Sequence, residues 1–441
     1  MSLARAVLGN ISSTIFGNLI LLLTGILTAR LLGPEGKGLY VMALLVPTLV
    51  VNALTLGIGN AGAYYIARRE RDVATVVGTS LAIVLPAGLV CTLAFEWLQA
   101  FGLWDSPAIS LIAVAAWSIP PILGFSMLRH AMLGMQRYGT FNVLNILERG
   151  SILLCLLGGF LVRGADVRLF CLLFVIASYA SFLVAAVLGW LAAGRRWRVD
   201  AGYARQALHY GLRGHVGWLA ELLNYRLDML LVHALAGARE LGLYSAAVSL
   251  AETLWILSTC ISVVLMPRLA SARQESSATT AVACRLTLPI TLLGAVVLAV
   301  TAGPLLRVLY GPLFAPSLQP LWLLLPGVVA LSVVKILSAD FGARNRPGIV
   351  SMVSWISLGA TIALDVLLIP GFAASGAAVA SSAAYTLSTI VAVAFYRRLT
   401  GTPAADLLVP RRSDADLLLG SLRRLAGRTV PGNGLAGRDL T

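Results

Sequence analysis

Charged residues are scarce in this chain. Only 12% of its 441 residues are charged and 59% are apolar, whereas an ordinary soluble domain is about 25% charged and about 45–50% apolar. A soluble fold with so few charges could not cover its surface with polar side chains. The composition therefore excludes a soluble enzyme, a disulfide-rich secreted domain and a disordered chain, and it indicates an all-α polytopic membrane protein.

Sequence signatures of cofactor and metal sites are also missing. No GxxxxGK[ST] phosphate loop occurs, and no His, Cys and carboxylate residues stand at metal-ligand spacing. None of the cysteines is closely paired, so we expect neither a disulfide framework nor a zinc motif. The five cysteines, which all fall in apolar runs, are Cys91, Cys155, Cys171, Cys260 and Cys284. We expect no metal, no cofactor and no ATP hydrolysis.

Long apolar runs make up most of the chain. A helix needs about 20 apolar residues to cross the bilayer, and the N-terminal run is interpreted as a first span rather than a removed signal. The predicted transmembrane helices, about 12 in number, are 10–31, 41–66, 77–100, 108–128, 143–162, 169–193, 208–235, 241–266, 282–302, 319–340, 349–369 and 373–396.

Positive charge is distributed unevenly between the connections. Most Lys and Arg residues fall in the connections on one side, and the positive-inside rule places that side in the cytoplasm. An even number of spans requires both termini on the same side, so we expect both in the cytoplasm. The formal charge of +14 is then explained by topology, and we expect no nucleic-acid partner.

A short motif repeats halfway along the chain. Leu31, Gly33, Gly38, Leu39 and Tyr40 recur as Leu235, Gly237, Gly242, Leu243 and Tyr244, at an offset of 204 residues. Both copies follow the first span of a six-span half. We therefore predict two six-helix lobes, residues 1–200 and 201–400, around a central cavity, as in transporters built from repeats. Residues 401–441 form a basic tail, either an amphipathic helix on the membrane surface or a disordered segment.

Besides Arg30 and Arg285, which lie near span ends and are counted with the adjoining connections, four cations fall inside predicted spans. A charge there is costly and usually faces a cavity or a partner. The four are Arg149, Arg213, Arg226 and Lys335. Their depths are biased towards the cytoplasmic side, which indicates an anionic substrate that enters from inside. Two alternatives stay open: Glu148 could neutralise Arg149, and Lys335 could extend its ammonium to the membrane surface.

The seventh span is the most polar. At 100° per residue, one stripe contains Arg213, Gly217, Glu221, Asn224 and Asp228, and a second contains His215, Leu222, Arg226 and His233. Such a helix cannot face lipid all round. We expect it to line a water-filled cavity on at least one face, although salt bridges that only fix packing are the alternative.

Other polar residues within the spans are candidate ligands. His215, Asn224 and Asn18 would add hydrogen bonds to the substrate. The carboxylates of Asp228, Glu221, Glu252 and Asp365 would bind a coupling proton or sodium ion, or would be protonated packing residues. These roles are predictions from position and residue type alone.

Several motifs together resemble the polysaccharide-repeat flippases (Wzx-type) of the multidrug/oligosaccharidyl-lipid/polysaccharide exporter superfamily. They are Ala29-Arg-Leu-Leu-Gly33-Pro-Glu-Gly-Lys-Gly-Leu-Tyr40 after Asn18, Gly57-Ile-Gly-Asn60 with Tyr64-Tyr65, Asn224-Tyr-Arg-Leu-Asp228, Leu243-Tyr-Ser-Ala-Ala-Val-Ser-Leu-Ala-Glu252, Pro267-Arg-Leu-Ala270, Ser338-Ala-Asp340 with Gly342 and Arg346-Pro347, and Leu368-Ile-Pro370-Gly with Gly376-Ala-Ala. Their order and spacing cover residues 10–397.

This resemblance implies a non-enzymatic carrier in the prokaryotic cytoplasmic (inner) membrane. Its substrate would be an undecaprenyl-diphosphate-linked oligosaccharide, moved to the outer leaflet by alternating access for surface polysaccharide biosynthesis. Membrane lipids, glycan polymerases and glycosyltransferases are the implied partners. Flippases of the peptidoglycan precursor commonly have fourteen spans and arginines in the first two. Spans one and two have no central arginine here, which argues against that substrate.

Two other functions remain open at this point. A cation-coupled multidrug exporter would share the fold, with Asp228, Glu252 or Asp365 as the protonated group. A membrane glycosyltransferase or polymerase would need catalytic acids in its outer loops, and the first outer loop contains only Glu35.

Overall fold

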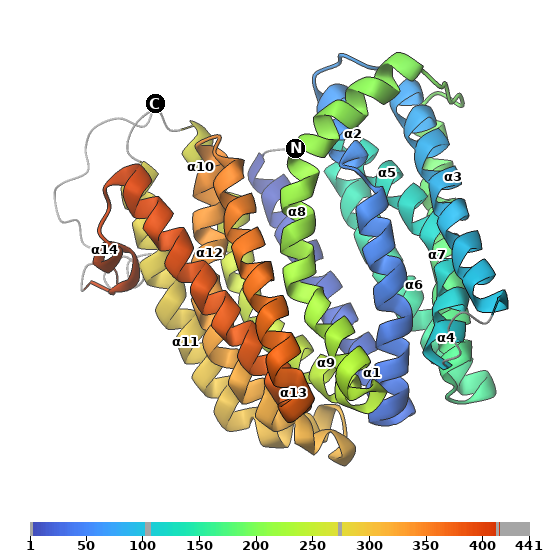
Figure 1. Cartoon of the computed structure of the whole chain (residues 1–441). Helices are drawn as coiled ribbons and strands as arrows, with labels where there is room; N and C mark the ends of the chain where they lie inside the picture. Colours follow the sequence, from blue (N-terminus) through green and yellow to red (C-terminus); the bar gives the residue numbers. More distant parts are fainter. Residues whose placement is uncertain (1–2, 102–106, 272–275, 412–413, 415–441) are drawn as a thin grey trace, which may run out of the picture.

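The computed structural model describes residues 3–101, 107–271, 276–411 and 414, and in these ranges the chain is built of helices joined by short turns (Figure 1). The helices are α1 (Leu3–Leu54), α2 (Ile58–Ala67), α3 (Val73–Ala100), α4 (Pro107–Ala116), α5 (Ile119–Gly134), α6 (Tyr138–Arg163), α7 (Val167–Ala192), α8 (Ala201–Ala236), α9 (Ala238–Ala251), η1 (Glu252–Leu254), α10 (Trp255–Ser271), α11 (Ser276–Leu309), η2 (Pro312–Ser317), α12 (Leu318–Ala343), α13 (Pro347–Thr400) and α14 (Ala404–Leu408).

These helices account for twelve membrane crossings in the described part of the chain. Eight helical segments are long and apolar enough to span a membrane, and α4 with α5 forms a ninth, bent by 42°. Two of the eight, α1 and α13, turn back at a kink and cross twice (Figure 1). The charged helix α8, 36 residues long, supplies the last crossing. The predicted fold class is confirmed.

The repeated motif marks a repeated turn. Gly33, where α1 turns back, has φ 67° and ψ −179°. Gly237, its counterpart 204 residues later, has φ 89° and ψ 176° between α8 and α9. Residues with a side chain rarely adopt a backbone conformation with positive φ, so glycine is favoured at both positions. The sequence repeat is therefore also a repeat of backbone geometry.

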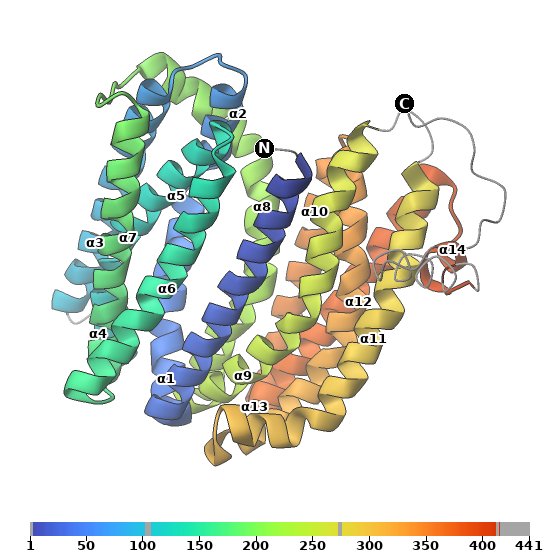
Figure 2. The same cartoon turned by 180° about the vertical axis from the view of Figure 1, so that it is seen from behind.

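Each lobe has its own apolar core. The core of α1–α7 contains Ile58, Leu123 and Leu128, and that of α9–α13 contains Leu321 and Val328. Figures 1 and 2 show α8 between the two bundles. Its first turns pack into the first core and its later turns into the second. The exact boundary at residue 200 stays a prediction.

The lobes meet where the two copies of the motif face each other. A Cβ on Gly38 would lie 1.7 Å from the Ala238 carbonyl oxygen, and one on Gly242 would lie 1.8 Å from the Pro34 carbonyl oxygen. These contacts are reciprocal, because Pro34 and Ala238 are themselves counterparts in the repeat. The arrangement is that of a two-fold interface within one chain. It closes the molecule at the end opposite the N-terminus of α1.

The first residues of the tail are anchored on the second lobe. Arg285 of α11 holds Asp414 through two hydrogen bonds of 2.7 and 3.0 Å and also donates to the Asp406 carbonyl oxygen at 2.7 Å. The hydrogen bond from Arg285 lowers the pKa of Asp414. This contact therefore persists at neutral pH and is lost as the pH falls through that lowered value. Residues 415–441, the rest of the expected tail, lie outside the described residues.

The glycine contact predicts the effect of adding a single methyl group. Gly38→Ala places a Cβ against backbone that cannot move without separating α1 from α9. We expect it to lower the free energy of unfolding by about 1–3 kcal/mol, measured by thermal unfolding in detergent. Gly303→Ala is the matched control, because a Cβ there meets nothing within 4 Å. Equal melting temperatures for the two variants would contradict the importance of the contact.

Candidate functional site: a cavity between the lobes

A cavity of about 650 Å³ lies between the two lobes. Its walls come from α1, α8, α9, η1, α10 and α12, so both lobes contribute. Most of the wall is apolar, with leucines of α1 on one side and Trp255 and Ile256 of α10 on the other. The volume falls in the range of small-molecule sites, about 300–1,000 Å³. The central cavity predicted from the repeat is therefore present.

The charged residues of the cavity wall are mostly basic. Lys37, Arg226 and Lys335 line the cavity, and among the described residues the acidic group beside them is Glu252. A low-dielectric wall strengthens the field of each charge. The cavity therefore favours an anionic occupant.

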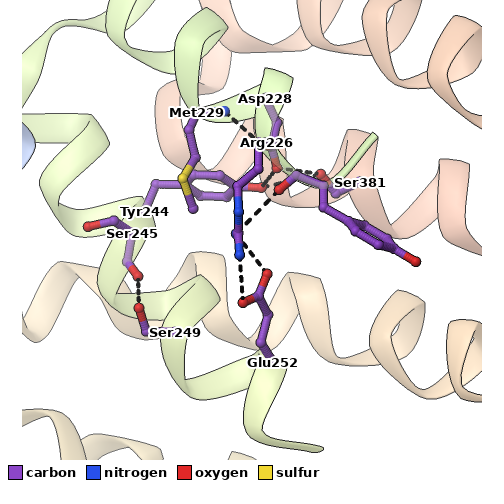
Figure 3. Close-up of polar contacts among 9 residues, drawn as sticks. Arg226, Asp228, Met229, Tyr244, Ser245, Ser249, Glu252 and Ser381 are labelled. Atoms are coloured by element: carbon purple, nitrogen blue, oxygen red, sulfur yellow. Dashed lines mark hydrogen bonds and ion pairs between the residues drawn. The ribbon is translucent and has the colours of Figure 1, made fainter. Parts of the chain in front are cut away.

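Arg226 is held by a carboxylate of the other wall. Its two guanidinium nitrogens donate to the two oxygens of Glu252 at 2.9 and 3.2 Å (Figure 3). Glu252 lies in η1, the short 3-10 turn between α9 and α10. Such a two-pronged bond is directional and strong. Arg226 is thus a cavity cation whose main hydrogen-bonding edge is already occupied.

Lys335 is held by aromatic rings. Its Nζ lies 5.1 Å from the ring centre of Tyr225 and 4.7 Å from that of Trp255. Trp255 is fixed in turn, because its indole N–H donates to the Val328 carbonyl oxygen at 3.0 Å. Cation–π contacts stabilise an ammonium without neutralising it. Lys335 therefore points into the cavity rather than to the membrane surface. The carboxylates of Glu221 and Glu252 also act on its charge, but neither forms an ion pair with it among the described residues.

Arg149 and Asn18, both predicted as site residues, meet in the first lobe. Arg149 donates to the Asn18 side-chain oxygen at 3.0 Å, and Asn18 lines the cavity. Glu148 lies 3.9 Å from Arg129 and also acts electrostatically on Arg149, so its compensation of Arg149 stays a prediction. Through its bond to Asn18, Arg149 orients an amide of the cavity wall.

The two predicted stripes of α8 face different surroundings. Leu222 and Arg226, of the second stripe, line the large cavity. Asn224 and Asp228, of the first, turn towards α13 inside the second lobe. Asn224 accepts a hydrogen bond from Thr361 at 3.0 Å. The cavity face of this helix is thus the Arg226 stripe.

The other predicted residues of α8 have separate environments. His215 Nε2 lies 3.2 Å from the Ala53 carbonyl oxygen of α1. Glu221 accepts from the Tyr225 hydroxyl at 3.2 Å and lines a small pocket of about 20 Å³ with Asn224. The side chain of Arg213 lies outside the described residues. The binding roles of all three stay predictions.

Two of the predicted carboxylates are buried in the second lobe. Asp228 accepts hydrogen bonds from the hydroxyl groups of Tyr244 and Ser381, at 2.6 and 3.2 Å (Figure 3). Asp365 is completely buried, and within the described residues neither of its oxygens has a hydrogen-bond partner. A buried carboxylate without partners is costly unless it is protonated or neutralised by a cation. Asp365 is therefore the acid most in need of a proton or metal ion.

Lys37 is a cavity residue that the sequence analysis missed. We expected a connection between spans at 32–40, which made Lys37 a residue of the outer loop. That expectation was wrong, because the turn at Gly33 needs so few residues that helix resumes before Lys37. The side chain is 6% exposed. Its place four residues after a turn-forming glycine is the signal that could have revealed it.

Fold and cavity together define a two-lobed helical membrane protein with a basic central cavity. A model of the family described as polysaccharide biosynthesis protein matches residues 3–273, and the model of the lipid II flippase MurJ matches residues 174–410. The chain belongs to this polysaccharide biosynthesis and flippase family, as its Wzx-like motifs predicted. None of the curated proteins matches it in sequence.

Solved structures share the fold at low sequence identity. An inward closed form of the lipid II flippase MurJ has a TM-score of 0.75 at 15% identity, covering 96% of this chain and 94% of that one. An inward-facing multidrug MATE transporter has a TM-score of 0.71 at 15% identity, covering 87% and 94%. A MATE transporter of Vibrio cholerae has a TM-score of 0.64 at 14% identity, covering 92% and 98%.

The Arg226–Glu252 contact predicts a strong coupling between the two side chains. Glu252→Gln or Arg226→Gln alone leaves one charge unpaired, and we expect each to lower the free energy of unfolding by about 1–3 kcal/mol. The double variant removes both charges and recovers most of the loss. Thermal unfolding of the four proteins gives the coupling energy. Additive losses would show that the two residues do not act as a pair.

Proposed function

We propose that this protein is a flippase for a lipid-linked oligosaccharide, with undecaprenyl diphosphate as the anionic carrier. The observation that carries the proposal is the charge of the cavity: three cations and one carboxylate in a largely apolar wall. A diphosphate suits the cations, and the apolar wall suits the attached lipid. Leu19 and Leu21, which line the cavity and are about half exposed, offer an apolar path along α1 for the prenyl chain.

Transport follows from the two-lobed architecture. The substrate enters from the cytoplasmic leaflet, its diphosphate meets Lys335, and the lobes then rock so that the cavity opens to the other side. For this the Gly38–Gly242 contact, which closes the opposite end, must separate. An anion moving outward across an inside-negative membrane gains about 2.3 kcal/mol per charge per 100 mV. No bond in the substrate needs to change, so the protein acts as a carrier rather than an enzyme.

Location and partners follow from the same proposal. The connections at the end that carries the N-terminus contain most of the basic residues. This supports cytoplasmic placement of both termini, and the proposed undecaprenyl-linked substrate implies the prokaryotic inner membrane. Glycosyltransferases would supply the substrate on that side, and a polymerase would use the product on the other.

We also propose that Asp365 and Asp228 bind the coupling cation, a proton or a sodium ion. Asp365 has no hydrogen-bond partner among the described residues, and Asp228 is the charged group that acts on it. The two come from α13 and α8 of one lobe. Movement of the lobe would thus be linked to occupancy of this site.

A cation-coupled exporter of multiple drugs is the second candidate. The buried carboxylates and the structural similarity to MATE transporters favour it. The basic cavity disfavours it, because exported drugs are commonly cationic. The two functions are separated by what accumulates when the protein is lost.

Deletion of the gene in its native host tests the flippase directly. We expect a complete lipid-linked oligosaccharide to accumulate on the cytoplasmic leaflet and surface polymer to be lost. Wild type restores the polymer. Lys335→Met, which removes a cavity cation that lines the proposed diphosphate site, restores less than a tenth of it at equal membrane levels. Accumulation on the outer leaflet would indicate a polymerase or transferase. Drug sensitivity without a glycan defect would indicate the exporter.

Asp365→Asn tests the coupling site. We expect this variant to melt at or above the wild-type temperature, because an unpartnered acid is removed, yet to lose the response of flipping in proteoliposomes to an imposed sodium or proton gradient. Asp340→Asn is the control. This equally buried acid accepts from Thr280 and Tyr396, so the substitution should lower the melting temperature. An unchanged gradient response in Asp365→Asn would exclude this acid from coupling.

A further inference from the structure

We propose that Lys37 is a second anion-binding residue, which holds the phosphate groups of the substrate at the far end of the cavity. The inference rests on the proposed function and adds a second binding position to it. Lys37 lines the same cavity as Lys335 but comes from the other lobe. It lies next to the glycine contact that closes the molecule.

The ammonium of Lys37 is oriented but not neutralised. Its Nζ donates to the Thr28 hydroxyl at 2.8 Å, and the ring centre of Tyr40 is 6.0 Å away. Within the described residues, no carboxylate forms an ion pair with it. Thr28 can accept this bond because its own hydroxyl donates to the Thr24 and Gly25 carbonyl oxygens, at 2.9 and 3.0 Å. A lysine has three N–H donors, so two remain for a ligand.

The repeat shows that this site has the opposite charge to its counterpart. At an offset of 204 residues, Tyr40 corresponds to Tyr244 and Thr24 to Asp228. In the second lobe the tyrosine donates to the carboxylate of Asp228. In the first lobe the acid is replaced by a threonine, and Lys37 stands where Leu241 is found in the other copy. Beside the equivalent tyrosines, one lobe thus carries an acid and the other a base.

The two lysines of the cavity lie at different depths. Lys37 is four residues from the turn at Gly33, or about 6 Å along the helix. Lys335 is seventeen residues from Leu318, where α12 begins, or about 25 Å from the same end of the molecule. A diphosphate that first meets Lys335 therefore has a second cation ahead of it. That cation is part of α1, whose contact with α9 must open for release.

Binding of prenyl diphosphates to the full-length protein tests this role. The probes are farnesyl diphosphate, farnesol and inorganic diphosphate, measured by calorimetry in detergent. We expect Lys37→Gln to weaken farnesyl diphosphate binding about tenfold, because a charge-assisted contact is lost. Lys37→Arg should stay within about twofold of wild type. Farnesol binding should be the same in all variants.

Control variants distinguish the loss of the Lys37 charge from a general loss of folded structure. Arg163→Gln removes an exposed cation at the same end of the molecule, outside the cavity, and should bind like wild type. Thr28→Val keeps the ammonium of Lys37 but removes the hydroxyl that accepts its hydrogen bond. This variant should weaken farnesyl diphosphate binding about threefold. Lys37→Met serves as a second neutral variant if Lys37→Gln does not fold.

Each binding result bears on the proposed role of Lys37. Equal binding of farnesyl diphosphate by wild type and the neutral variants would overturn the role of Lys37 and leave the flippase intact. Weaker binding of farnesol as well would show that Lys37 only supports the fold, which also overturns it. No binding of farnesyl diphosphate by wild type would count against the proposed function itself. Tight binding of inorganic diphosphate alone would mean a site for free phosphate rather than for a lipid headgroup, and would overturn the assignment to the lipid-linked substrate.

Discussion

The structure depends on one close approach of backbone to backbone, where α1 meets α9. Gly38 faces Ala238 and Gly242 faces Pro34, at distances that leave no room for a side chain. Because these residues are counterparts in the repeat, each lobe offers the other the same surface. Such a contact can form or break as a unit, since packed backbone does not deform gradually. In the proposed transport cycle this contact would separate two states of the molecule, one closed at this end and one open.

The three cavity cations are each stabilised away from water by different groups. A charge removed from water needs compensation. Arg226 receives it from the carboxylate of Glu252. Lys335 receives it from two aromatic rings and from more distant carboxylates, and Lys37 from one hydroxyl and the ring of Tyr40. These arrangements leave different amounts of charge for a ligand. A diphosphate must displace Glu252 to reach the forked edge of Arg226, whereas the two lysines need no such rearrangement.

The length of apolar runs was enough to predict the crossings, and the spacing of Gly33 and Gly237 was enough to predict the repeat. The polarity of α8 also pointed to the cavity, because lipid cannot surround such a helix. Which stripe of α8 faces the cavity was not predictable, since this depends on how the helix rotates against α13. The pairing of Arg226 with Glu252 joins residues on two helices and leaves no local pattern. Lys37 was missed because one glycine sufficed for a turn that we had expected to need a longer connection.

The opposite charge of the two repeated sites has a consequence for transport. An anion held by Lys37 in one lobe and a cation held by Asp228 and Asp365 in the other would attract each other through a medium of low dielectric constant, where Coulomb forces are strong. Each would then reduce the cost of burying the other. A repeat with identical charges would instead have two sites that repel like ligands. Divergence of the two copies at Lys37 and Leu241, and at Thr24 and Asp228, thus turns a symmetric scaffold into one suited to carry opposite charges at equivalent places.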